Sequence, residues 1–392
     1  MNYKTIFIIF LYFPLFFFIT GCHNVTKTDI IDLDREDDVS VHDIFSEISI
    51  VIPENRNDYM ISTIYNIEYH NGKYYIFDIK SQQVFCLDDK GQFHFKISSA
   101  GSGPGEYIYV AHMSIDRINE QILLLEPSMQ RLQIFDFNGH YLETINISNE
   151  VSLAYNYAFA LNANTIVLIS ITGDQLVFFC RNKREIIETD FPMAISTGVS
   201  PFSPSYRSFY QLEDKSFFIP VFSQQIYDIS DLQPQPHYKW DFGVNNNTRE
   251  EYNNLISELK SKESRKMSKI DFVGRGKAIN HSIVKIDETS RYIMAVIEYN
   301  NDFKNVIIDK KEDKSYVFRA FKEGVSLLFL NIFNHKAMAS AAEYDYVSPA
   351  LREERILSRF DPSVLKKNDL NRLENWDELQ DNMFFVVYKF RD

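Results

Sequence analysis

The most conspicuous chemistry-like motif in the sequence is a glycine-rich loop within the run SSAGSGPGEY, Ser98–Tyr107. Such a loop could cradle a phosphate with its backbone N–H groups. However, it lacks the GK[ST] ending of a P-loop, and no helix pattern follows it. We interpret it as a structural crossing in which glycines take conformations closed to other residues, and in which Glu106 accepts backbone N–H bonds. The residues assigned to this turn are Gly101, Gly103, Pro104, Gly105 and Glu106.

Three residues far apart in the sequence could form a binding site: His112, Arg207 and His281. An Arg guanidinium can bind a carboxylate with two hydrogen bonds, and two His side chains beside it would favour an anionic or carboxylate-bearing ligand. Catalysis or metal binding would need several such groups to converge. The alternative is that the histidines are solvated or satisfied in the core and that Arg207 forms an ion pair on the rim.

Motifs of known catalytic and metal sites are absent from the sequence, which has no GxSxG, HExxH or CxxC. Recurrent Asp residues at the ends of predicted strands could suggest Ca²⁺ sites, but their spacing is not that of an EF-hand. Asp in hairpin turns is the simpler explanation. These residues are Asp78, Asp88, Asp116, Asp136, Asp287 and Asp309. No catalytic residue, metal or cofactor is predicted.

Composition places these residues in a packed globular protein that leans towards β structure. The 392 residues are 45% hydrophobic and 24% charged, which excludes general disorder, collagen and a disulfide-dense scaffold. Aromatic residues make up 15% and favour the half-buried surfaces of β-strands. The net charge of −13 argues against a nucleic-acid partner, which normally needs a basic face.

The N-terminus is typical of a lipoprotein leader. Lys4 precedes an apolar run over Ile6–Ile19, which is too short to span a bilayer. The following Ile-Thr-Gly-Cys resembles a bacterial lipobox, so residues 1–21 are predicted to be a signal peptide and Cys22 the acylated first residue of the mature chain. Two or three acyl chains anchor a protein stably. The alternatives are an ordinary signal peptide with an incidental Cys, or a short membrane anchor.

The segment after Cys22 is polar and acidic. Loss of Lys4 with the leader leaves 40 basic and 54 acidic residues, so the mature charge is 40 − 54 = −14. Residues 22–40 are predicted to be a flexible, solvated tether to an outer membrane. The sequence HNVTKT directly after Cys22 leaves the periplasmic or surface-facing side open. Cys86 and Cys180 lie in different strand-like runs and are predicted to be free thiols; a single disulfide between them is the alternative.

The body of the chain repeats with a period of 45–50 residues, the size of a propeller blade. Lys73–Ile97 and Gln121–Ile145 share one pattern of strands and turns, offset by 48 residues, with Gly91 matching Gly139. An Asp or Asn before Gly is a hairpin signal. Four more units are more degenerate. The last lacks a strand, and an unpaired strand at Glu47–Ile52 could supply it, which would remove an open edge.

This pattern predicts an all-β, six-bladed β-propeller over residues 41–392, with short helical insertions, closed by an N-terminal strand. The insertions are expected at Asn245–Lys269, where apolar residues have helical spacing, and at Pro349–Leu379. His112 and His281 start the inner strands of the second and fifth units, and Arg207 lies just before the strands of the fourth unit. Because inner strands converge on the axis of a propeller, these residues are predicted to share one funnel mouth.

The GPGEY turn after the first unit, the blades and the lipobox together resemble six-bladed β-propeller lipoproteins of Bacteroidota, relatives of NHL-repeat and TolB-like propellers. The resemblance covers residues 40–390 and implies a fold and a cell-envelope location. It implies no shared reaction, because fold does not determine function.

Three functions fit the sequence. The leading one is a non-catalytic binding protein anchored to the membrane by lipid, with an envelope protein, peptide or glycan as partner. The second is an NHL-type lyase or hydrolase with a funnel active site. The third is an assembly subunit that binds through the Asn245–Lys269 helix. Convergent His, Asp and Glu residues in the funnel would favour the enzyme.

Overall fold

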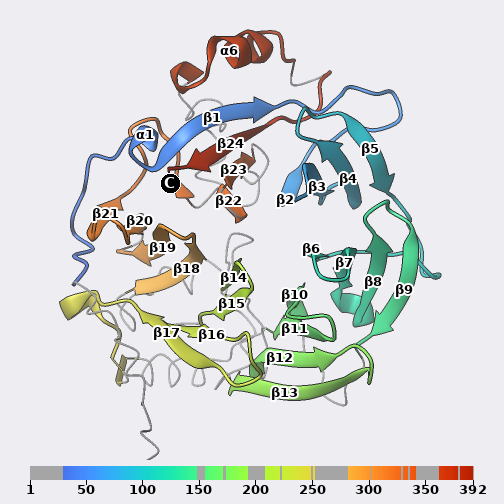
Figure 1. Cartoon of the computed structure of the whole chain (residues 1–392), viewed down its shortest axis with the longest axis horizontal. Coiled ribbons are helices and arrows are strands. Elements are labelled where there is room, and N and C mark those ends of the chain that lie inside the picture. Colours follow the sequence, from blue (N-terminus) through green and yellow to red (C-terminus); the bar gives the residue numbers. More distant parts are fainter. Residues whose placement is uncertain are drawn as a thin grey trace, which may run out of the picture.

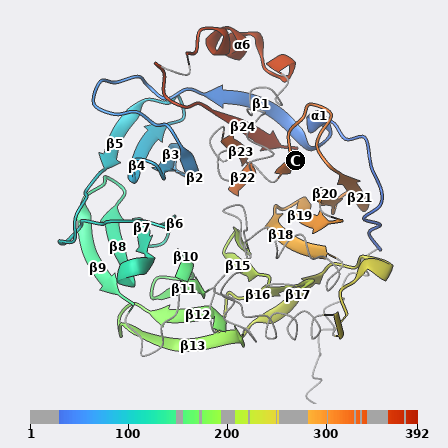
Figure 2. The same cartoon turned by 180° about the vertical axis from the view of Figure 1, so that it is seen from behind.

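The computed structural model describes residues 30–147, 155–170, 174–192, 208–220, 223–248, 250–251, 281–300, 302–327, 330–333, 336–340, 362–377 and 380–391. Within these ranges the strands form six antiparallel sheets of four strands each. The sheets are arranged around a central axis (Figures 1 and 2). The prediction of an all-β propeller with few helices is therefore confirmed.

Five sheets consist of four consecutive strands, with the first strand nearest the axis (Figure 1). The first sheet contains β2 (Ile64–His70), β3 (Lys73–Asp78), β4 (Gln83–Asp88) and β5 (Phe93–Ile97). The second contains β6 (His112–Asp116), β7 (Gln121–Glu126), β8 (Arg131–Asp136) and β9 (Tyr141–Asn146). The third contains β10 (Tyr155–Ala160), β11 (Thr165–Ser170), β12 (Asp174–Cys180) and β13 (Glu185–Pro192). The fourth contains β14 (Phe209–Leu212), β15 (Lys215–Phe218), β16 (Gln225–Asp228) and β17 (Gln235–Lys239). The fifth contains β18 (His281–Glu288), β19 (Tyr292–Tyr299), β20 (Asp302–Asp309) and β21 (Lys314–Phe318).

The remaining sheet joins the two ends of the chain. It contains β22 (Leu330–Phe333), β23 (Lys336–Ser340), β24 (Phe385–Phe390) and, at its outer edge, β1 (Phe45–Val51). β1 pairs antiparallel with β24, placing Ile48 opposite Tyr388 and Ile50 opposite Val386. Asn382, just before β24, accepts a hydrogen bond from the Ile61 backbone N–H at 2.6 Å. The C-terminal strand is thus tied to β1, and the residue just before it is tied to the connection between β1 and β2.

Equivalent turns explain the 48-residue repeat. At Gly91 and Gly139 φ is +84° and +83°, the left-handed region that favours glycine. In each turn the glycine N–H donates to the backbone carbonyl of the Asp three residues earlier, Asp88 or Asp136, at 3.0 Å. The side chain of that same Asp accepts two further backbone N–H bonds. The Asp and Gly pattern in the sequence therefore encodes one turn geometry twice.

The core lies between neighbouring sheets, as β3 illustrates. Successive side chains of a strand point to opposite faces. Tyr74 and Ile76 pack in one buried cluster with Phe385 of β24, while Tyr75 and Phe77 pack in another with residues of β6 and β7. Because both faces of the strand are buried, KYYIFD reads as a nearly continuous apolar run.

The flexible tether predicted for residues 22–40 is wrong for its described part, residues 30–40. This segment runs along the outer rim (blue in Figure 1) past the fifth sheet to the fourth. Ile31 and Leu33 are buried in the cluster that contains Trp240, and the Asp37 N–H donates to the Val317 carbonyl at 2.7 Å. Apolar side chains alternate with acidic ones here, so the segment buries one face and leaves its acids in water. We call residues 30–40 the rim segment.

Helices are short within the described ranges. They are α1 (Val41–Ile44), η1 (Pro127–Met129), η2 (Gly243–Asn245), η6 (Pro362–Val364) and α6 (Lys367–Glu374). Among the residues described, no helix is long and apolar enough to cross a membrane. The leader with Cys22, residues 252–269 of one predicted insertion and residues 350–360 of the other lie outside the described residues. Cys86 and Cys180 are both free thiols; Cys86 is buried, and this burial raises the pKa of its thiol to about 12.

Candidate functional site

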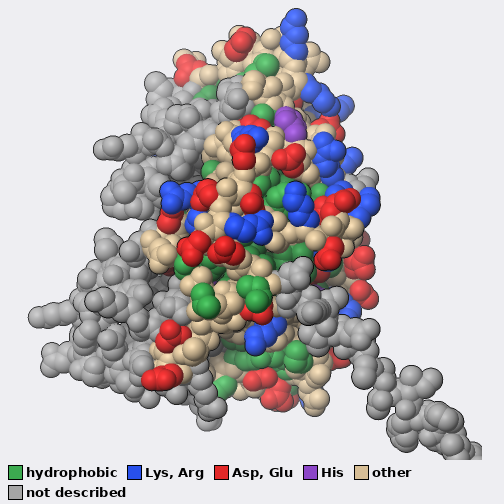
Figure 3. All heavy atoms as spheres, turned by 90° about the vertical axis from the view of Figure 1, so that its left-hand side faces the viewer, with side chains coloured by type: hydrophobic (Ala, Val, Ile, Leu, Met, Phe, Trp, Pro, Cys, Tyr) green, Lys and Arg blue, Asp and Glu red, His purple; other side chains and the backbone are tan. Residues whose placement is uncertain are grey.

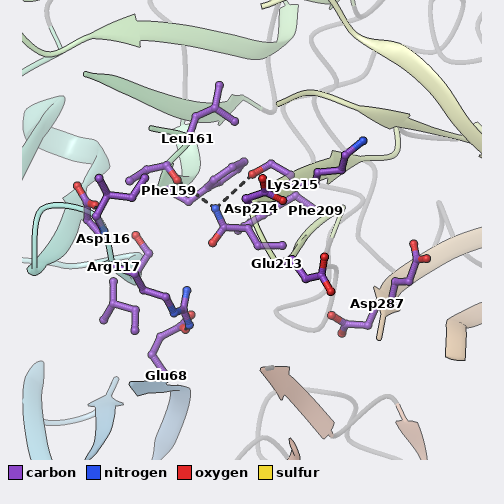
Figure 4. Close-up of a pocket in the computed structure, with 17 residues that line it drawn as sticks. Glu68, Asp116, Arg117, Phe159, Leu161, Phe209, Glu213, Asp214, Lys215 and Asp287 are labelled. Carbon is purple, nitrogen blue, oxygen red and sulfur yellow. Dashed lines mark hydrogen bonds and ion pairs between the residues drawn. The ribbon is translucent and has the colours of Figure 1, made fainter. Parts of the chain in front are cut away.

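Five sheets contribute to one cavity of about 320 Å³. Its lining includes residues towards the ends of the inner strands β2, β6, β10 and β18, and the β14–β15 hairpin (Figure 4). Representative lining residues, one from each of these elements in that order, are Glu68, Asp116, Phe159, Asp287 and Glu213. Inner strands of a propeller run towards a shared mouth, so residues up to 220 positions apart in sequence meet there.

An aromatic pair forms the apolar wall of the cavity. The rings of Phe159 and Phe209 are stacked, with centroids 4.1 Å apart and an interplanar angle of 7°. Gln211 links the same two sheets, because its side-chain amide donates to the Ala160 carbonyl at 3.1 Å. These contacts fix the wall between the third and fourth sheets. The cavity therefore offers an apolar surface beside polar groups, the usual composition of a ligand pocket.

Three acidic residues of the lining are held in ion pairs. Asp116 is bound by Arg181 at 2.8 Å, and Glu68 by Arg117 at 3.3 Å. Glu288 is bound by Lys310 at 2.9 Å. Asp116 also accepts N–H bonds from the turn that follows β6, so the hairpin explanation of its sequence pattern holds for this residue.

Glu288 is the most constrained of these carboxylates. Besides Lys310, it accepts a 2.6 Å hydrogen bond from the Tyr210 hydroxyl and lies 3.1 Å from His237 Nε2. Burial alone would raise the pKa of Glu288, but hydrogen bonds from His237, Lys310 and Tyr210 outweigh burial and hold this pKa below its usual value. The carboxylate is therefore ionised at neutral pH and committed to protein partners.

Two other acids of the lining, Glu213 and Asp214, face solvent. Glu213 and Asp214 form the exposed turn between β14 and β15, and Glu213 has a φ of +55°. Within the part of the chain that the structure describes, neither has an ion-pair partner. The neighbouring cation, Lys215, is bound to Asp228 at 2.8 Å. Figure 4 places the Glu213 and Asp287 side chains on the same side of the cavity. The mouth is consequently negative.

The two predicted histidines lie elsewhere. His112 and His281 begin β6 and β18, at the opposite ends of these strands from the cavity-lining residues. The His112 ring packs edge-on against Tyr157, with centroids 5.0 Å apart, and lies behind the cavity wall, 6.3 Å from Phe209. Arg207 lies outside the described residues. A shared mouth for the three residues thus stays a prediction.

His281 is a core side chain. Its Nδ1 lies 2.9 Å from the Asn245 carbonyl, so this nitrogen carries the proton. The ring meets Phe242 edge-on at 4.6 Å, and burial lowers the pKa of His281 to about 4. The imidazole is therefore neutral at physiological pH, which fits a core position better than a role in holding an anion.

The glycine-rich loop turns the chain from β5 to β6. The Glu106 side chain accepts a hydrogen bond from the Gly103 N–H at 2.9 Å, and Arg131 and Gln133 donate to the Glu106 carbonyl. Gly105 has a φ of +75°, and a Cβ there would lie 2.8 Å from the Tyr141 ring. The loop is packed against the second sheet, and its glycines serve this packing.

No metal site is evident among the residues described, which contain no group of three or more His, Cys, Asp or Glu side chains placed to hold an ion. The motifs of the sequence predict no role for Glu213, Asp214, Arg117 or Glu288. The signal that could have found them is position, since each lies at or near the end of an inner strand. Asp116 and Asp287 were noticed, but only as turn residues.

Sheets radiating from one axis, with a cavity at the ends of the inner strands, define the chain as a β-propeller. The family model described as "Domain of unknown function (DUF4934)" matches residues 26–389, and the chain belongs to this family. No curated protein matches it.

Two solved structures from Bacteroides share the fold. The chain is similar to a protein of Bacteroides fragilis whose name describes it as exported, with 16% identity, a TM-score of 0.69, and coverage of 93% of this chain and 100% of that one. It is also similar to a DUF4221 family member from Bacteroides vulgatus, with 12% identity, a TM-score of 0.51, and coverage of 91% and 99%. Likeness at this level of identity shows the fold alone.

Proposed function

We propose that this protein is a lipid-anchored binding protein of the cell envelope that holds a ligand in the cavity at the ends of its inner strands. The observation that carries the proposal is the convergence of five sheets on one cavity, with an aromatic wall and a polar rim. A binding role is favoured over catalysis because Glu288 and Asp116, two buried carboxylates of the site, are engaged by protein donors. A general acid or base needs a group free to exchange its proton with substrate, whereas Glu288 and Asp116 are each fixed by several donors.

The ligand that best suits this cavity carries a cationic group, such as a basic peptide side chain or an amino sugar. Six acidic and two basic side chains line the cavity, and both bases are already paired with acids. The acidic lining therefore favours a cationic ligand, whereas His112, Arg207 and His281 predict an anionic one. A carboxylate-bearing ligand would be repelled by Glu213 and Asp214, while an aromatic wall beside carboxylates suits an organic cation.

Binding is tested by calorimetry on the acylated protein in detergent, with a lysine-containing tripeptide, an acidic tripeptide and a neutral oligosaccharide as probes. We expect the lysine peptide to bind best. The double variant Glu213→Gln/Asp214→Asn should weaken it by up to about fivefold per carboxylate, since exposed ion pairs contribute up to about 1 kcal/mol each. Glu374→Gln, an exposed acid on α6, is the matched control. Failure of all three probes to bind, or equal binding by the double variant, would reject the cavity as the ligand site.

The proposed lipid anchor is Cys22, which follows the leader. Its support is the lipobox pattern, together with the Bacteroides fragilis neighbour, whose name describes it as exported. An outer-membrane location and the NHL/TolB-like relationship are parts of the same proposal. Cys22→Ala should leave the protein soluble or uncleaved. A variant that remains in the membrane after removal of its leader would contradict acylation.

The ring architecture completes the proposal: six blades, closed by the N-terminal strand β1. Its support is the set of six four-stranded sheets and the register of β1 with β24. A strand from the N-terminus in the C-terminal sheet removes an open edge, which would otherwise invite aggregation. An experimental structure in which β1 pairs with another strand, or with another molecule, would reject closure.

A further inference from the structure

Two exposed apolar side chains belong to the first described residue of the rim segment and to the adjacent η2 turn. Ile30 is 66% exposed and Val244 is 96% exposed. Ile30 lies over the η2 turn, because a Cβ added to Gly243 would be 2.9 Å from Ile30 Cγ2. Figure 3 views the side along which the rim segment runs and shows hydrophobic side chains exposed among charged ones of both signs. Single exposed aliphatic residues are ordinary, but this pair lies at the end of the rim segment that is nearest to Cys22 in the sequence.

The turn that presents Val244 is firmly built. Asp241 Oδ1 accepts hydrogen bonds from the Gly243 N–H at 2.9 Å and from the Asn246 side chain at 2.8 Å. Asn246 in turn accepts the Phe242 N–H at 2.7 Å. Phe242 beneath the turn is buried. Val244 is therefore held away from the core by a fixed network of hydrogen bonds.

The position of Ile30 is equally fixed. The Ile31 N–H donates to the Asp241 carbonyl at 2.8 Å, and the Ile31 side chain is buried. Seven residues separate Ile30 from Cys22. The eight Cα–Cα steps between them span at most about 29 Å when fully extended. An anchor at Cys22 would hold this part of the rim close to the lipid.

We propose that Ile30 and Val244 form a membrane-contact edge that meets the lipid surface when Cys22 is acylated. The inference rests on the lipid anchor of the proposed function. Both side chains are aliphatic and uncharged, as an interfacial contact requires. Asp32 and the later exposed acids of the rim segment keep the contact shallow. Because the edge is on the outer rim (Figure 1), the propeller stands on its rim and the cavity opens parallel to the membrane.

Lipid quenching of tryptophan fluorescence tests the edge. The acylated full-length protein carrying Val244→Trp is reconstituted into phosphatidylethanolamine/phosphatidylglycerol vesicles with and without brominated acyl chains. Met129→Trp is the matched control, since Met129 is an exposed apolar residue of η1, in the connection between β7 and β8 of the second sheet. We expect the loss of fluorescence to be about twofold greater for Val244→Trp than for Met129→Trp. The difference is modest because an interfacial side chain reaches only the upper acyl region. Wild-type protein gives the background from Trp240 and Trp376.

The outcomes separate the edge from the anchor. If wild-type protein fails to float with vesicles, the lipid anchor is wrong, and the membrane-contact edge, which depends on it, is rejected as well. If the protein floats but Val244→Trp and Met129→Trp are quenched equally, the anchor stands and the edge is rejected. Ile30→Trp provides a second probe should Val244→Trp misfold. A soluble Cys22→Ala protein that dimerises, and becomes monomeric with Val244→Ser, would assign the edge to a second copy of the chain and overturn the proposal.

Discussion

The Tyr210 hydroxyl donates a 2.6 Å hydrogen bond to Oε2 of Glu288, a residue of the cavity lining, and so joins the inner strands of the fourth and fifth sheets. The carboxylate also receives Lys310 from the β20–β21 turn and faces His237 of β17. The Glu288 side chain is only 5% exposed, so water cannot replace these donors. This one buried charge connects two sheets whose positions shape the cavity.

Replacing Glu288 by Gln should destabilise the fold. Gln keeps the shape but removes the charge that compensates Lys310, and removing one partner of a buried pair costs about 2 kcal/mol or more. Chemical denaturation at pH 7 measures the loss in free energy of unfolding. Glu374→Gln on α6 serves as the control and should change it little. A Glu288→Gln protein as stable as wild type would show that the link between the two sheets is dispensable.

The same variant should lose its effect in acid. The pKa of Glu288 is lower in the folded state than in the unfolded chain, so its contribution is present above the unfolded value of about 4.3 and is lost as pH falls through the folded value. We therefore expect the stability difference between wild type and Glu288→Gln to be full at pH 7 and to shrink below about pH 4. A difference that does not vary with pH would contradict ionisation of Glu288 as its source.

His281 should make the protein sensitive to a milder acid range. Burial lowers the pKa of its imidazole to about 4, against about 6.5 in the unfolded chain. Between these values the unfolded chain binds a proton that the folded protein excludes, so stability falls as pH drops from 6.5 towards 4, by up to about 3 kcal/mol. His281→Phe should be less stable at pH 7, having lost the bond to the Asn245 carbonyl. Its stability should nevertheless change less between pH 7 and pH 5 than that of wild type. An unchanged pH slope in both His281→Phe and His281→Gln would assign the sensitivity to another group.

The sequence predicted the propeller because local turn chemistry and strand patterns repeat. Asp88 and Gly91, like Asp136 and Gly139, form their turns from residues within five positions of each other. Such short-range signals are readable in one sequence. The pairing of Ile50 with Val386 is long-range and could be anticipated only from counting strands.

The cavity and the rim segment were harder to predict for different reasons. Glu213 and Phe159 line the cavity through the convergence of separate sheets, and no local pattern records which inner-strand ends meet. The rim segment carried a usable signal, namely Ile31 and Leu33 alternating with acids. The net acidity of the rim segment favours a tether, whereas its apolar period of two indicates a strand-like segment with one buried face. The structure shows that the second signal is the informative one.

Gly91 should tolerate alanine less well than Gly72. Both have positive φ, +84° and +76°, so the backbone strain of the substitution is similar. They differ in surroundings: a Cβ on Gly91 would lie 2.3 Å from the Ile52 carbonyl oxygen, whereas one on Gly72 would meet only an Asp89 side-chain oxygen at 3.6 Å. We expect Gly72→Ala to cost about 1 kcal/mol and Gly91→Ala clearly more, as measured by thermal unfolding. Equal costs would mean that the Ile52 backbone moves freely away from the turn.

Truncation of the N-terminal segment should affect stability in steps that follow its contacts. Deleting residues 23–29 leaves the rim segment whole and provides the reference melting temperature. Deleting residues 23–40 removes the buried side chains Ile31, Leu33 and Val39, and complete burial of one such side chain is worth about 1.5–3 kcal/mol, so a clear loss is expected. Deleting residues 23–52 also removes β1, exposes the edge of β24 and should cause aggregation or loss of the cooperative transition. Calorimetry and light scattering on the three proteins measure these steps. A 23–52 deletion that melts like wild type would exclude β1 as a closing strand, and a harmless 23–40 deletion would restore the tether interpretation of the rim segment.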